Sequence, residues 1–291
     1  MAIFSFRLGC GLLIAFLFTG CSSVFFYPDN KHYSTAEELN PQSQSVFLDT
    51  ADGTRIHALW LPAKTTAPKG SILFFHGNAQ NLSSHVINLA WINRYGYNLL
   101  IFDYRGFGQS VGSPTVGGAL LDAQAAYEWL IDKEKGPIYL VGQSLGGALA
   151  TGFAAQRPEV ASRINGLIVD ATFTSYQKIA REKLAEAWLT WPLQYPLSWI
   201  VISGPDPIDS LEQLTGLPKL LIHSTQDQVI PFSHGQQLYM AASEPKSRLI
   251  TDTPHAYTFT VKSNQQALLE FLTETQTKKP RQSAALNNQG D

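Results

Sequence analysis

The chain has little cysteine and no excess of charge of either sign. Only Cys10 and Cys21 occur among its 291 residues, too few for the disulfide framework of a small secreted domain. The 21 basic and 23 acidic residues give a net charge of −2, and the basic residues are scattered. A nucleic-acid partner is therefore not expected.

The sequence also lacks the complete patterns of nucleotide and metal sites. A glycine-rich loop at residues 103–108 follows a predicted strand, but no Gly-Lys-Ser/Thr triplet follows it. The pair His76-Gly77 ends another strand without a second histidine or carboxylate at ligand spacing, so no metal is expected there. We interpret His76 as structural, and Asp103 and Arg105 as a charge pair.

The N-terminal apolar run, residues 8–18, is too short to cross a bilayer as a mature helix. Arg7 precedes the run, an arrangement typical of a signal peptide. The segment ends in a small residue and Cys21, which resembles a bacterial lipobox, so we expect cleavage before Cys21 and its lipidation. The serine that follows favours the outer membrane over the inner one. A soluble secreted protein and an uncleaved anchor remain alternatives.

The most informative segment is residues 138–148, which read as a buried strand, a Gly-Gln-Ser-Leu-Gly turn and a small-residue helix. This order predicts a nucleophile elbow with Ser144 as the nucleophile. Gly142 and Gly146 fit because strand and helix backbones crowd together at such a turn. The helix start leaves the N–H of Leu145 free to stabilise an oxyanion.

A serine nucleophile needs a base and an acid, which follow such elbows in the chain order Ser, Asp, His. Asp227 lies on the loop after a predicted buried strand, residues 219–223. His255 follows a strand that Pro254 ends. We predict that His255 is the base and that Asp227 orients it.

Other residues compete for these two roles. His234 lies at the start of a predicted helix, too soon after Asp227 to come from a separate strand. Asp170 ends the strand after the elbow, where some enzymes with this kind of elbow carry the acid. Asp252 is too near His255 along the chain to face it easily, and we interpret it as a turn former.

A second oxyanion donor is expected from the loop after an early strand, residues 71–75. The sequence His76-Gly77-Asn78 follows that strand, and Gly77 allows a tight backbone turn. We therefore predict that the N–H of Asn78 points at the substrate carbonyl.

After a predicted hairpin, residues 45–49 and 55–60, strands alternate with helices. This pattern predicts an α/β fold with a doubly wound, mainly parallel sheet flanked by helices and an antiparallel N-terminal edge. The length, the apolar content of 44% and the absence of an internal repeat suit one domain. The expected helices cover residues 82–95, 116–131, 145–155, 176–189 and 264–276.

These motifs follow one another as in the serine hydrolases of the α/β-hydrolase fold. Over residues 45–275 the chain resembles that family, and most of all its cap-poor subgroup of protein depalmitoylases and bacterial lipoproteins. The resemblance implies hydrolysis through a covalent acyl-serine and neither a metal nor an organic cofactor. It departs from the family where His223-Ser224 replaces the usual His-Gly pair. The motifs are His76-Gly77-Asn78-Ala79, residues 103–108, residues 142–147, and the loops of Asp227 and His255.

We expect four segments: a signal peptide at residues 1–20, a lipidated tether at 21–44, the hydrolase domain at 45–276 and a disordered tail at 277–291. Within the domain, the aromatic insert at residues 187–202 could cover an acyl pocket, contact a membrane or pack as core. The expected activity is cleavage of acyl esters or thioesters by an enzyme anchored in the bacterial cell envelope. A catalytically silent lipoprotein and a serine peptidase of the same fold are the alternatives.

Overall fold

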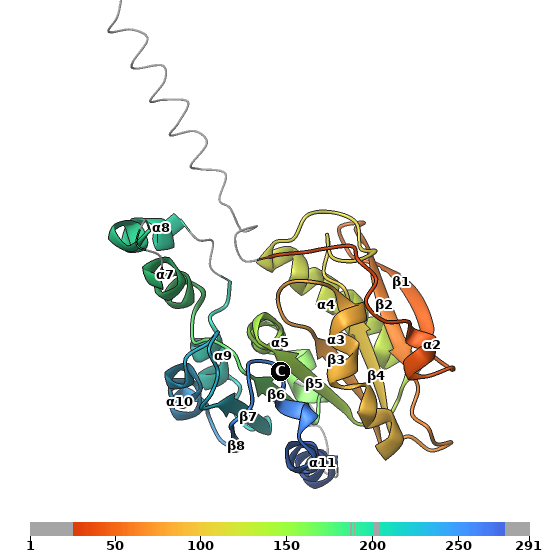
Figure 1. The fold of residues 1–291 in the computed structure, drawn as a ribbon. Coiled ribbons are helices and arrows are strands. Elements are labelled where there is room, and N and C mark those ends of the chain that lie inside the picture. Colours follow the sequence, from red (N-terminus) through yellow and green to blue (C-terminus); the bar gives the residue numbers. More distant parts are fainter. Residues whose placement is uncertain (1–25, 187, 189, 201–203, 277–291) are drawn as a thin grey trace, which may run out of the picture.

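The computed structural model describes residues 26–186, 188, 190–200 and 204–276. Within these ranges, one sheet has the strand order β1-β2-β4-β3-β5-β6-β7-β8 (Figure 1). Cys21, the predicted signal peptide and the predicted tail lie outside the described residues. The strands are β1 (Gln44–Asp49), β2 (Arg55–Leu61), β3 (Gly70–Phe75), β4 (Tyr97–Phe102), β5 (Ile138–Gln143), β6 (Gly166–Asp170), β7 (Lys219–Ser224) and β8 (Lys246–Thr251).

The sheet confirms the predicted fold class. Strand β2 pairs antiparallel with both β1 and β4, whereas every pairing from β4 through β3 to β8 is parallel. All residues of β3, β4 and β5 are buried, because helices cover both faces of a doubly wound sheet. The edge strands β1 and β8 are mostly exposed or partly exposed.

Helices cover the two faces of the sheet, and side chains alternate between them. In β3, Leu73 and Phe75 join the apolar cluster under α4, α5, α9 and α10, whereas Ile72 and Phe74 join the cluster under α3, η3 and α11. The helices are α2 (Ala36–Leu39), α3 (Leu82–His85), η2 (Val86–Asn88), η3 (Ala90–Tyr95), α4 (Val116–Lys133), α5 (Leu145–Ala155), α6 (Pro158–Arg163), α7 (Tyr176–Glu186), η4 (Trp191–Leu193), α8 (Gln194–Ile200), α9 (Pro207–Gln213), α10 (Phe232–Ala241), η5 (Thr258–Thr260) and α11 (Lys262–Gln276). In the described part of the chain, none of them has the length and apolar character needed to cross a bilayer.

The predicted single helix at residues 82–95 is wrong in detail. A four-residue α3 is followed by two 3-10 segments, η2 and η3, with Leu89 out of helical conformation between them. The buried amide of Asn93 donates to the carbonyls of Leu61 and Tyr97. Side-chain bonds of this kind compete with a regular helix, so contacts with the sheet decide the local structure.

Residues 26–43, which we expected to belong to a tether, pack on the domain instead. Phe26 is 3% exposed and meets Phe107 edge to face. Further along, the amide of Asn40 donates to the carbonyl of Pro62. Within the described residues the folded unit therefore begins at Phe26 rather than at residue 45.

The aromatic insert forms η4 and α8, which pack on α7 away from the sheet (Figure 1). Trp188 is 87% exposed, and Trp191, Leu193 and Tyr195 are at least half exposed. Core packing is therefore the wrong interpretation for these four side chains, which leaves a lid or a contact surface.

Candidate active site

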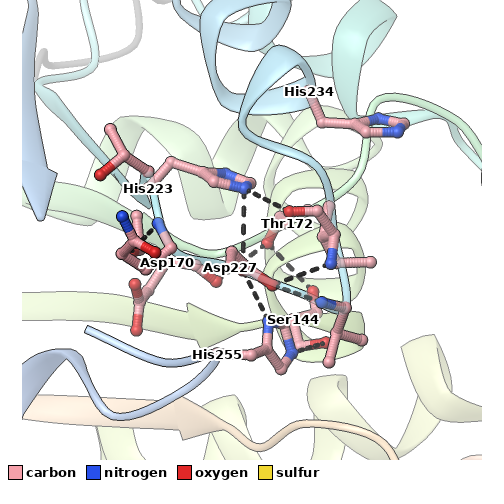
Figure 2. A network of polar contacts seen from close by, with 12 residues as sticks. Ser144, Asp170, Thr172, His223, Asp227, His234 and His255 are labelled. Atoms are coloured by element: carbon pink, nitrogen blue, oxygen red, sulfur yellow. Dashed lines mark hydrogen bonds and ion pairs between the residues drawn. The ribbon is translucent and has the colours of Figure 1, made fainter. Parts of the chain in front are cut away.

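The three predicted catalytic residues meet at the carboxyl edge of the parallel sheet. Ser144 follows β5, Asp227 follows β7 and His255 follows β8. His255 Nε2 lies 3.0 Å from Ser144 Oγ, and its Nδ1 lies 2.7 Å from Asp227 Oδ2 (Figure 2). The structure thus joins the three side chains in one chain of hydrogen bonds.

Ser144 occupies the strained turn expected of an elbow. Its backbone has φ 56° and ψ −120°, a conformation that costs a non-glycine residue about 1–3 kcal/mol. The surroundings enforce it, because Ser144 N donates to Asp170 O at 2.8 Å and Thr172 Oγ1 donates to Ser144 O at 3.0 Å. A β-carbon at Gly142 would collide with the backbone of Gly146. The strain therefore holds Ser144 Oγ out of the turn, toward His255.

The carboxylate of Asp227 is fully enclosed and hydrogen-bonded on both oxygens. Oδ1 accepts from the N–H groups of Val229 at 2.8 Å and Ile230 at 2.9 Å, and Oδ2 faces His255. Burial opposes its ionisation, but the hydrogen bond and charge of His255, with these two N–H groups, hold the pKa of Asp227 below its usual value. Asp227 is therefore an anion at neutral pH.

An anionic Asp227 determines which nitrogen of His255 is free. With Nδ1–H donating to Asp227 Oδ2, Nε2 of the neutral ring is left as an acceptor for the hydroxyl of Ser144. This tautomer can remove the serine proton. The imidazolium that forms is stabilised by the carboxylate next to it.

The structure places His234 and Asp170 in other roles. His234 Nδ1 accepts from Thr174 N at 3.0 Å, and its Nε2 lies 2.7 Å from Glu182 Oε2, which joins α10 to α7. Figure 2 shows His234 apart from Ser144. Asp170 lies near the triad, but its carboxylate bonds to residues other than His255.

Asp170 belongs to a network that the sequence did not reveal. Its Oδ2 accepts from Gln143 Nε2 at 2.9 Å and its Oδ1 from Thr258 Oγ1 at 2.8 Å. Burial raises the pKa of Asp170, and these hydrogen bonds oppose the rise. Gln143 Nε2 also donates to Ala256 O at 3.2 Å. The network therefore ties the residue before Ser144 to the loop that carries His255.

Leu145 follows Ser144 directly, and the loop that carries Asn78 packs against Ser144 through Gly77. Leu145 is the first residue of α5, so its N–H has no partner one turn earlier in the helix. A β-carbon at Gly77 would lie 3.6 Å from Ser144 Cβ, which places residues 77–81, here called the oxyanion loop, against the nucleophile. Asn78 lies on this loop.

The expected charge pair between Asp103 and Arg105 is wrong. Asp103 Oδ1 accepts from Leu82 N at 2.7 Å, and the carboxylate lies near His57 and His76. The backbone between the two residues turns their side chains to different neighbours. The guanidinium of Arg105 contacts Asp52 and Asp122 instead.

His76 is fully buried, and its Nε2 lies 3.5 Å from Asp103 Oδ1. Its ring stacks on His85 and contacts Tyr104, as its structural interpretation requires. In the ranges that the structure describes, no group of three or more histidine, cysteine, aspartate or glutamate side chains is arranged to hold a metal ion.

A doubly wound sheet with a nucleophile elbow and a Ser-His-Asp chain at its carboxyl edge defines the class of α/β-hydrolases. The chain belongs to the α/β-hydrolase family, and residues 66–211 match the member family described as serine aminopeptidase, S33. The protein YfhR of Salmonella typhi is 32% identical over 252 residues, 81% of this chain and 82% of that protein. YfhR of Escherichia coli K12 is 35% identical over 243 residues, 81% of this chain and 80% of that protein.

Among solved structures, the esterase Pf2001 of Pyrococcus furiosus superposes with a TM-score of 0.68. Its sequence is 22% identical, and the match covers 86% of this chain and 97% of Pf2001. At this identity the likeness shows a shared fold.

Proposed function

We propose that this protein is a serine hydrolase that cleaves acyl esters or thioesters through a covalent acyl-serine. The observation that carries the proposal is the unbroken hydrogen-bond chain from Ser144 Oγ through His255 to Asp227, with Ser144 on a strained elbow. Each member has the partner and the orientation that the chemistry needs.

Acylation begins when His255 Nε2 takes the proton of Ser144 Oγ. The oxygen bonds to the acyl carbon, and the carbonyl oxygen becomes an oxyanion that the N–H groups of Leu145 and Asn78 stabilise. Collapse of this intermediate breaks the carbon–oxygen or carbon–sulfur bond, and the imidazolium protonates the leaving alcohol or thiol. Asp227 holds the imidazolium in place throughout.

Deacylation repeats these steps with water as the nucleophile. His255 Nε2 takes a proton from water, the hydroxyl attacks the acyl carbon, and Ser144 leaves with the proton returned to it. The products are the carboxylic acid and a regenerated Ser144. In both halves of the reaction His255 carries every proton, and the two oxyanion donors only stabilise the negative charge on the carbonyl oxygen.

The proposed substrates are esters or thioesters with short or medium acyl chains. The apolar, exposed side chains of η4 and α8 support an uncharged substrate. Pf2001, whose fold superposes on this chain, is named an esterase, and that likeness gives the ester class added support.

Covalent labelling with a fluorophosphonate probe tests the proposal. Wild-type protein should take up the probe on Ser144, as peptide mass spectrometry would show, and should hydrolyse p-nitrophenyl acyl esters. Ser144→Ala should lose both while keeping the wild-type melting temperature, because Ser144 is partly exposed and no core contact is lost. Labelling or full turnover in Ser144→Ala would refute Ser144 as the nucleophile.

The description of the matching family makes an aminopeptidase the second candidate. The same triad can cleave an amide bond, with an amine in place of the alcohol as leaving group. Side-by-side assays with p-nitrophenyl acyl esters and aminoacyl p-nitroanilides separate the candidates. We expect turnover of the esters; faster turnover of the anilides would favour the peptidase.

We further propose that the enzyme is held in the bacterial cell envelope by lipidated Cys21. The support is the apolar run followed by a small residue and cysteine, together with the exposed tryptophans of the aromatic insert. The outer membrane is the proposed site, because serine rather than aspartate follows Cys21.

A further inference from the structure

The oxyanion loop has a conformation that its own residues do not favour. Ala79 has φ +65° and Gln80 has φ +58°, two consecutive non-glycine residues in the left-handed region. Such a backbone persists only where its surroundings hold it. The position of the Asn78 N–H, one residue earlier, therefore depends on the contacts that the loop makes with other segments.

One set of contacts comes from α3 and from Asp103, the residue after β4. The Nε2 hydrogen of His85 is donated to Ala79 O at 3.1 Å, and Leu82 N donates to Asp103 Oδ1 at 2.7 Å. These bonds hold the start of α3 and the carbonyl of Ala79. Neither of them contacts Asn78 or Gln80.

A second set comes from the N-terminal strap, as we call residues 26–33. Tyr27 N donates to Asn78 Oδ1 at 2.9 Å, so the strap holds the side chain of the proposed oxyanion donor itself. Pro28 forms a parallel bridge with Gln80. Asn81 Nδ2 also donates to Asp29 Oδ1 at 2.8 Å. The strap therefore binds the loop at Asn78, Gln80 and Asn81, which the bonds of His85 and Asp103 do not reach.

The strap is itself fixed to the domain on both sides of these bonds. Phe26 is buried against Phe107, with ring centroids 6.1 Å apart. Asp29 O accepts from Gly108 N at 2.9 Å, and Tyr33 N donates to Ser83 Oγ at 3.1 Å. Because the strap is fixed on both sides of Tyr27 and Pro28, a shift of the strap would also shift the oxyanion loop.

From these contacts we infer that the N-terminal strap is a positioning element of the active site: it sets the Asn78 N–H where the substrate oxyanion forms. The inference rests on the proposed function and extends it, since it assigns a role in transition-state stabilisation to a segment outside the predicted hydrolase domain. Loss of the strap's contacts should lower kcat and leave KM nearly unchanged, because the oxyanion exists only in the transition state.

Two variants of the full chain test this inference. Tyr27→Pro removes the N–H that Asn78 Oδ1 accepts, and Phe26→Ala removes the buried anchor of the strap. Each should lower kcat for a soluble p-nitrophenyl ester about 10- to 100-fold, the loss typical of a slightly misplaced catalytic group, with KM within about twofold. Rates are expressed per active site titrated with the fluorophosphonate, so that unfolded protein does not count.

Matched controls accompany each variant. Tyr27→Ala removes the exposed ring but keeps the N–H, and should retain kcat within about threefold. Phe271→Ala truncates a phenylalanine on α11 that is 6% exposed. It should lower the melting temperature as Phe26→Ala does without changing kcat per titrated site, because Phe271 packs over Gly166 of β6 and not on the strap.

The outcomes distinguish the two proposals. Wild-type kcat per titrated site in both Tyr27→Pro and Phe26→Ala would overturn the role of the strap and leave the proposed function standing. Equal kcat losses in Phe271→Ala would also overturn it, because general destabilisation would then explain the effect. A wild-type protein that neither takes up the probe nor cleaves the ester would overturn the proposed function and this inference with it.

Discussion

Two buried carboxylates lie beside His255, and their surroundings give them different roles. Asp227 accepts two backbone N–H groups and a histidine N–H, which favours the anion. Asp170 receives two neutral donors, Gln143 and Thr258, in a fully buried site. Asp227 is therefore suited to stabilise an imidazolium, whereas Asp170 is suited to hold two loops together.

Asparagine substitutions separate these roles. Asp227→Asn should lower kcat by about 10⁴, because an amide no longer holds His255 in the productive tautomer. Asp170→Asn keeps an acceptor for one donor and should lower kcat by about tenfold or less. Steady-state kinetics on a soluble ester measure both, and the reverse order would assign the acid to β6.

His85 should make stability depend on pH. Burial, together with the charge of neighbouring His76, lowers the pKa of His85 from 6.5 to about 4. Its contribution to the free energy of unfolding is fully present above pH 6.5, where His85 is neutral in both the folded and the unfolded protein. It is lost as the pH falls toward 4, since only the unfolded chain then binds the proton, at most about 1.4 kcal/mol per pH unit.

Urea unfolding at pH 7, 6 and 5 measures this contribution. His85→Gln should lose less of its free energy of unfolding over this range than the wild type, because the substitution removes the titrating group. Parallel losses in the two proteins would contradict the assignment.

The chemistry of single residues explains which parts of the site could be predicted. Ser144, Asp227 and His255 each follow a strand, and they occur in the chain order Ser, Asp, His. This order can be recognised in the sequence alone. Gln143 and Thr258 have no such mark, because amides and hydroxyls occur throughout the chain and only the fold selects partners for them. Asp170 is recognisable by its position at the end of a strand. Its hydrogen bond with Thr258 could not be predicted, because Thr258 lies far away in the sequence.

Among the elements, helix α4 is joined to the loop after β1 through one arginine. Arg105 donates to Asp122 Oδ1 on α4 at 2.8 Å and to Asp52 Oδ2 at 2.7 Å. Asp122 is fully buried, and burial raises its pKa although Arg105 bonds to it. The buried negative charge of Asp122 therefore depends on the ion pair with Arg105.

Removing one partner should destabilise the protein strongly. Arg105→Ala leaves Asp122 buried without its ion pair and should lower the free energy of unfolding by about 3–5 kcal/mol. The double variant Arg105→Met with Asp122→Leu should recover most of this loss, since no buried charge remains. Urea denaturation gives both values. A double variant as unstable as Arg105→Ala would show that the charges themselves are required.

Elements with a strong repeating pattern were predictable, and those fixed by distant contacts were not. The strands β3, β4 and β5 are continuous apolar runs, and the residue pattern of α5 follows directly from the elbow. The segment after α3 has an equally helical pattern, but the amide of Asn93 bonds to β2 and β4 instead. The N-terminal strap mixes aromatic and polar residues with no helical or strand period, so its sequence does not show where it attaches.

At the scale of the whole molecule, the proposed lipid anchor makes membrane binding depend on Cys21. Lipidation would join two acyl chains through glycerol and a third on the amino group, well beyond the marginal anchoring by a single myristoyl chain. Cys21→Ser should therefore move the enzyme from the membrane fraction to the soluble fraction. It should also abolish incorporation of radiolabelled palmitate.

Fractionation in high salt is the check on that result. Salt removes proteins held only by surface charge, so a variant that still sediments would be held by apolar contacts. If Cys21→Ser sediments and the wild type takes up no palmitate, the lipid anchor is refuted. The exposed side chains from Trp188 to Tyr195 would then account for membrane binding.

With the proposed anchor at Cys21, the attachment of Phe26 to the core would also limit the distance between the folded domain and the membrane. Cys21 precedes Phe26 by five residues, which span about 18 Å even when fully extended. A free segment up to residue 44 would instead allow more than about 70 Å. An enzyme lipidated at Cys21 would thus work within one protein diameter of the bilayer, on molecules that sit in the membrane or diffuse to its surface, and not on distant layers of the cell wall.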